Sequence, residues 1–170
     1  YFYYITDKLT MIQATTETAF SIYVQTEDNR IDTSVASTQI RHLVKFTNDL
    51  DKSVQYAYGS SETIKDRFTK IVMTYNLTPD VYTGKTKLLP AGYWKYEIFE
   101  VSWIGTVTVS AGNAPINEDD VLTPVANDKG VVQGLVTKGK MNVSEKDGTQ
   151  QVQYTQRQEP SGTNYIYYGQ

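Results

Sequence analysis

Short runs in which apolar and polar residues alternate one by one constrain this chain most strongly. The clearest run covers residues 92–101, where Trp94, Tyr96 and Ile98 share one face and charged residues occupy the other. Alternation with a period of two is typical of a β-strand that buries one face. We therefore predict a strand over 92–101 and a structural core that contains Trp94, Tyr96 and Ile98.

Similar runs recur along the chain and are separated by turn signals. They cover residues 18–26, 40–46, 53–58, 71–77, 104–110, 131–143, 152–154 and 165–168. Gly134 and Gly139 interrupt the run at 131–143, and glycine inside a strand pattern indicates a bulge or a close backbone approach. Residues 61–67 alone predict a short helix, with Ser61 in the capping position.

The composition agrees with a β-rich fold. Thr, Val, Tyr and Ile supply 63 of the 170 residues, whereas Leu supplies only 8. Branched and aromatic side chains fit a half-buried pleated surface. About eight to ten short strands predict an all-β fold, an immunoglobulin-like or jelly-roll β-sandwich. We expect one sandwich domain over residues 18–170, and residues 1–17 form either an N-terminal arm or its first strand.

Residue types and charge exclude several functions. The chain has no cysteine, one histidine (His42) and a net charge of −3 that is spread evenly. A thiolate nucleophile, a His-based triad and a multi-His metal site are therefore excluded within one chain. No basic region indicates a nucleic-acid partner. No apolar run approaches the ~20 residues that a transmembrane helix needs, so we expect no membrane association.

The remaining polar residues predict no catalytic, metal or cofactor site, so we expect no enzyme. The acidic run 117–120 lacks the spacing and glycine of a calcium loop. Glu97 and Glu100 fall on opposite faces of a strand, which does not suit a glycosidase pair, and both are expected to face solvent. His42 has no evident partner and is interpreted as an ordinary strand histidine.

Two segments are candidates for a partner interface. A loop over 111–130 is long for a compact domain, and ordering it costs ~1–2 kcal/mol per residue, so it should be mobile or ordered by a partner. The chain begins without an initiator Met, at an aromatic end that would suit a neighbour's sheet edge or form the first strand of its own sheet. The candidate contact residues are Tyr1, Phe2, Tyr3, Tyr4, Pro115, Ile116 and Pro124.

Five segments carry a resemblance to a known family. They are Leu43-Val-Lys-Phe-Thr-Asn-Asp49, Lys65-Asp-Arg-Phe-Thr-Lys70, Gly92-Tyr-Trp-Lys-Tyr-Glu-Ile-Phe-Glu100, Gly134-Leu-Val-Thr-Lys-Gly-Lys-Met-Asn-Val143 and Asn164-Tyr-Ile-Tyr-Tyr168. Their succession resembles a family of small virion proteins of tailed phages that infect Bacteroidota and of related marine and crAss-like phages. The resemblance covers about residues 40–168 and consists of strands and turns. Lys138 departs from it, because the family often has Thr before the glycine.

The resemblance implies a non-enzymatic virion protein, an auxiliary or decoration protein that braces the capsid shell. Its implied partners are the major capsid protein and other virion proteins, in many copies per particle, after assembly in the cytoplasm of the bacterial host. The alternative is a receptor- or glycan-binding module of a tail fibre or head fibre. An exposed cluster of Tyr56, Tyr58, Tyr82 and Tyr93 would favour a host-surface glycan. Neither function implies a cofactor.

Overall fold

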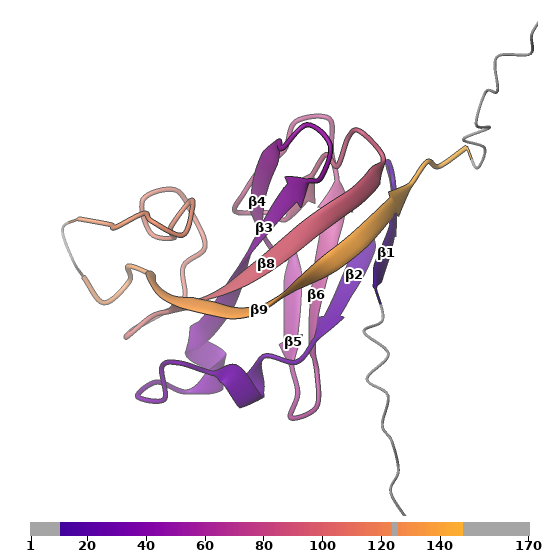
Figure 1. The fold of residues 1–170 in the computed structure, drawn as a ribbon. Helices are drawn as coiled ribbons and strands as arrows, with labels where there is room; N and C mark the ends of the chain where they lie inside the picture. Colours follow the sequence, from indigo (N-terminus) through magenta and orange to yellow (C-terminus); the bar gives the residue numbers. More distant parts are fainter. Residues whose placement is uncertain (1–10, 124–125, 148–170) are drawn as a thin grey trace, which may run out of the picture.

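The computed structural model describes residues 11–123 and 126–147, which form two β-sheets packed face to face (Figure 1). This part of the chain has nine strands, two short 3-10 turns, η1 (Glu27–Asn29) and η2 (Ser37–Gln39), and no α-helix. The strands are β1 (Ile12–Thr15), β2 (Phe20–Val24), β3 (Ile40–Asn48), β4 (Val54–Tyr58), β5 (Ser61–Ile64), β6 (Thr69–Tyr75), β7 (Lys85–Thr86), β8 (Gly92–Ser102) and β9 (Val131–Ser144). The prediction of an all-β, sandwich-like fold is confirmed.

The strands divide unequally between the sheets. One sheet has the order β1-β9-β8-β3-β4, and the other has the order β2-β6-β5, with β7 pairing with β6 as its fourth strand. Strand β8 pairs antiparallel with both β3 and β9, whereas β1 runs parallel to β9. The chain changes sheet four times, between β1 and β2, between β2 and β3, between β4 and β5, and between β7 and β8.

The main core lies between the two sheets. Trp94, Tyr96 and Ile98 of β8 belong to it, as the alternation at 92–101 predicts. Phe20 and Phe46 meet across the sheets with their ring centroids 6.2 Å apart, in an edge-on arrangement that suits aromatic pairs. The same core contains Val44, Ile71, Met73 and Val143.

Two secondary-structure predictions are wrong. Residues 61–64 form β5 instead of a helix, because they pair with Thr69–Val72 of β6, and a single capped turn is too short to compete with that pairing. Residues 104–110 form no strand and belong to the β8–β9 connection. The runs predicted at 152–154 and 165–168 lie outside the described residues.

Both glycines of β9 have the roles predicted for them. The β8–β9 register shifts twice around Gly134, whose φ of +151° is a conformation that side chains disfavour. Gly139 lies directly opposite Tyr96, and its missing side chain leaves room for the tyrosine ring. The sheet can therefore bend at Gly134 and accept a close contact at Gly139.

Candidate functional site

The connection between β8 and β9, residues 103–130, is the largest non-strand feature of the described chain (Figure 1). It packs on the outer face of the five-stranded sheet through a second apolar cluster. Trp103 and Ala114 come from the connection, and Leu43, Tyr58 and Val101 come from the sheet; all five are buried. This cluster gives the connection an apolar anchor of its own.

Backbone acceptors in the connection extend this anchor. The Tyr58 hydroxyl donates to the carbonyl oxygen of Pro115 over 2.7 Å, and the Trp103 indole N–H donates to that of Asn113 over 3.3 Å. Burial raises the pKa of the Tyr58 phenol well above its ordinary value, so Tyr58 remains a donor. Pro115 is buried against its own sheet. Its assignment to a partner interface stays a prediction.

Glu118 forms the polar attachment of the connection to the sheet. Its carboxylate accepts from the Lys45 ammonium over 2.6 Å and from the Tyr56 hydroxyl. Burial works to raise the pKa of Glu118, but the hydrogen bonds from Lys45 and Tyr56 outweigh it and lower the pKa. The bond to Glu118 raises the pKa of Lys45. Burial, together with the bond to Glu118, raises the pKa of Tyr56 to about 12.

The last residues of the connection are also tied to its middle. The Lys129 ammonium donates to the carbonyl oxygen of Gly112 over 2.6 Å and to the side-chain oxygen of Asn113 over 2.8 Å. The Gly130 N–H donates to the carbonyl oxygen of Asn113 over 2.8 Å. Apolar anchoring and polar ties within the chain therefore offset part of the entropy cost of ordering this loop, a contribution that the expectation of a loop either mobile or ordered by a partner does not include.

The anchored connection carries exposed apolar side chains. Ile104 is 70% exposed, Ile116 45% and Val121 78%. Ile116 is thus on the surface, where a contact residue must be. The other predicted contact residues, Tyr1, Phe2, Tyr3, Tyr4 and Pro124, lie outside the described residues. The connection therefore presents apolar groups from a fixed support.

The acidic run of this connection satisfies neighbouring groups of its own chain. Asp120 accepts the backbone N–H of Ile116 over 3.0 Å, and the side-chain oxygen of Asn117 accepts that of Asp119 over 2.9 Å. Within residues 11–123 and 126–147, no three His, Asp or Glu side chains lie close enough together to hold a metal ion. Side chains of this run therefore accept hydrogen bonds from backbone N–H groups of the same loop and stabilise its conformation.

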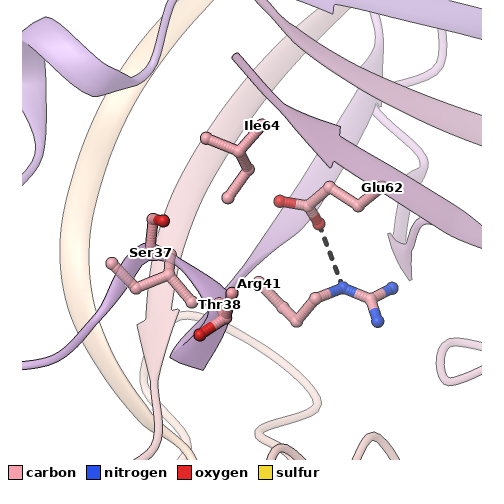
Figure 2. A pocket seen from close by; sticks show the side chains of 6 residues that line it. Ser37, Thr38, Arg41, Glu62 and Ile64 are labelled. Atoms are coloured by element: carbon pink, nitrogen blue, oxygen red, sulfur yellow. Dashed lines mark hydrogen bonds and ion pairs between the residues drawn. The ribbon is translucent and has the colours of Figure 1, made fainter. Parts of the chain in front are cut away.

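A polar contact joins the two sheets at the start of β3. Glu62 of β5 accepts from the Arg41 side chain over 3.1 Å, from the His42 backbone N–H over 3.1 Å and contacts the His42 ring. Figure 2 shows Arg41 and Glu62 beside a shallow depression that Ser37, Thr38 and Ile64 also line. The buried Glu62 carboxylate is the partner of His42 that the sequence did not indicate.

Glu100 corrects another prediction, because it is buried and does not face solvent. Its carboxylate accepts the backbone N–H groups of Ile31 and Asp32, the latter over 2.8 Å. Glu100 lies on the inner face of β8, next in the row after Ile98. Its donors, Ile31 and Asp32, belong to the connection between β2 and β3. Glu97, on the outer face, pairs with Lys95 over 2.9 Å.

The four tyrosines considered for glycan stacking do not form one exposed cluster. Tyr58 is buried, Tyr56 and Tyr82 pack against the second apolar cluster, and Tyr93 alone is exposed. Another aromatic pair is on the surface instead. The rings of Tyr23 and Phe68 lie 6.0 Å apart on the outer side of the four-stranded sheet. Their separation of 45 positions left no sequence signal for the contact.

Comparison of the chain with protein-family models, curated proteins and solved structures finds no match. In the described residues there is also no helix long and apolar enough to cross a membrane.

Proposed function

We propose that the chain is a non-enzymatic structural protein of a tailed-phage virion, an auxiliary capsid protein that binds and braces the shell. Its partners are the major capsid protein and other virion proteins, in many copies per particle. The finer assignment to an immunoglobulin-like or a jelly-roll topology is part of this proposal. The sequence resemblance over residues 40–168 and the sandwich-like fold support it.

The exposed apolar side chains of the anchored connection carry the proposal. Ile104, Ile116 and Val121 extend from a segment that its own chain already orders. Binding of a partner to these side chains loses little free energy to ordering of the loop, so even a small contact area can give measurable affinity. Many copies on a regular shell strengthen such contacts further through effective concentration.

Incorporation into particles tests this proposal. Ile116→Ser and Val121→Ser should reduce the amount of protein that co-sediments with particles, because each removes exposed apolar contact area. Leu50→Ser is the matched control, since Leu50 is 87% exposed in the β3–β4 turn, away from the connection. Equal incorporation of all three variants would contradict a contact through residues 103–123.

The alternative function is a glycan-binding module of a tail or head fibre. The exposed Tyr23 and Phe68 rings are the observation that favours it, because sugars stack on exposed aromatic faces. Tyr23→Ala should then abolish binding to host-surface glycans and leave the protein folded. If the variant binds glycans as well as the unmodified protein, or if neither binds, this alternative fails.

A further inference from the structure

Strand β2 is an edge strand whose outward backbone groups are unpaired in the described chain. On the neighbouring β6, the carbonyl of Val72 accepts from Ser60 and the N–H of Thr74 donates to Gly84, both over 2.8 Å. Both groups therefore point away from β2. Neighbouring residues of a strand direct their backbone groups to opposite sides. The β6 residues that alternate with Val72 and Thr74 therefore point toward β2.

The β2–β6 register then fixes which β2 groups are paired. Phe20, Ile22 and Val24 lie opposite Met73, Ile71 and Thr69, the β6 residues that point toward them. The backbone N–H and C=O groups of Ser21 and Tyr23 consequently point outward. Each of these two residues offers one donor and one acceptor at the edge of the sheet.

The other sheet edges are protected. Along β4, the Tyr58 N–H donates to the carbonyl of Val81 over 2.8 Å, and the Gln55 side chain bonds the backbone of Lys87. Strand β5 carries the inward carboxylate of Glu62, and β1 is only 4 residues long. Short strands, inward charges and covering segments all prevent unwanted strand pairing.

Strand β2, which is 5 residues long, carries no inward charge, and no backbone hydrogen bond from another segment of the described chain protects its outer edge. Residues 18–26 contain no charged residue, no proline and no glycine. Tyr23 is 58% exposed and Phe68 40% exposed, and the Lys70 ammonium lies 5.8 Å from the centre of the Tyr23 ring. An uncharged, aromatic edge strand is the kind of edge that accepts another strand.

We propose that β2 is a self-association surface and that two copies of the chain pair their β2 strands antiparallel about a two-fold axis beside Ile22. Ser21 of each copy then lies opposite Tyr23 of the second copy. The two-fold axis makes two such Ser21–Tyr23 pairs. In each pair both residues donate one hydrogen bond and accept one, so the outward N–H and C=O groups of Ser21 and Tyr23 are all satisfied. The uncharged strand is self-complementary in this arrangement, which favours a second copy over a different protein. This inference goes beyond capsid binding and does not depend on it.

Molecular mass in solution, measured on the full chain over a wide concentration range, gives the first test. We expect the mass to rise with concentration toward twice the 19.2 kDa of one chain. Tyr23→Lys places a charge at the edge and should weaken the dimer about tenfold or more. Ser61→Lys, on the other edge strand of the same sheet, is the matched control and should leave the dimer unchanged.

Hydrogen exchange at single amides gives the second test, and it needs no variant. The amides of Ser21 and Tyr23 should become protected as concentration rises, while those of Ile22 and Val24 are protected throughout.

If Tyr23→Lys fails to fold, Ser21→Pro removes one outward donor without removing a bond to β6. A chain that is monomeric at every concentration would overturn the proposal. So would a dimer insensitive to Tyr23→Lys, or amides of Ser21 and Tyr23 protected equally in a monomer.

Discussion

Tyr96 lies over Gly139 in the β8–β9 pair, and the two residues depend on each other. A Cβ atom added to Gly139 would lie 2.6 Å from the Tyr96 hydroxyl oxygen and 2.8 Å from the ring carbon that carries it. Gly139→Ala should therefore destabilise the fold by about 1–3 kcal/mol through overpacking. Urea unfolding measures this loss.

A double-mutant cycle separates the contact from the loss of glycine itself. In a Tyr96→Leu background the ring is absent, so Gly139→Ala should cost clearly less than it does in the unmodified protein. Equal costs in both backgrounds would mean that the ring does not explain the glycine.

Trp94 tests the position of the main core. Its side chain is fully buried between the sheets, so Trp94→Ala should lower the free energy of unfolding by about 3–5 kcal/mol. Tyr93→Ala is the neighbouring control on the exposed face and should cost much less. A loss below about 1 kcal/mol for Trp94→Ala would contradict the assignment of the faces.

Glu118 should control how firmly the 103–130 connection is attached. Glu118→Gln removes the charge that pairs with Lys45, and we expect it to cost about 1.5–3 kcal/mol, the range for hydrogen bonds to charged groups. Amide exchange in residues 113–120 should accelerate first. Asp119→Asn, an exposed acid of the same loop, should leave both quantities unchanged.

The same attachment predicts a pH dependence at both extremes. Because the pKa of Tyr56 is raised to about 12, its stabilising effect is complete below pH ~10, the unfolded value, and is lost between pH ~10 and ~12. Because the pKa of Glu118 is lowered, its contribution is present above its ordinary pKa and is lost as pH falls through the folded value.

Tyrosinate absorbance measures the alkaline part directly. Tyr56→Phe should remove one group that ionises near pH 12 and leave the rest of the titration curve unchanged. If the variant instead loses a group with an ordinary pKa, the buried hydrogen bond between Tyr56 and Glu118 is not formed in solution.

Strands that alternate strictly could be predicted from the sequence, and isolated contacts could not. The run at 92–101 indicated β8 and its buried face, because one face carries only apolar residues before Glu100. Residues 61–64 were misassigned because Ser61 and Glu62 resemble a helix start, and only the pairing with β6 decides otherwise. Local signals are weak in such short segments, and tertiary pairing overrides them.

The candidate site was predicted only in part for a similar reason. The length of the 111–130 loop drew attention to the segment that includes Glu118, and Ile116 is exposed there. Its anchors, Lys45 and Tyr56, come from strands far away in the sequence, so nothing local indicated that Glu118 would meet them. His42 and Glu62 are likewise 20 positions apart, and Glu100 is 68 positions from its donor at Asp32.

Electron microscopy of purified particles, with the copy number of the protein, tests the central claim most directly. The proposal predicts sandwich-shaped density at regular positions over the shell, in numbers proportional to the capsomers. The connection between β8 and β9 should face the major capsid protein. A few copies confined to the tail or portal, or no copies in the particle, would contradict it.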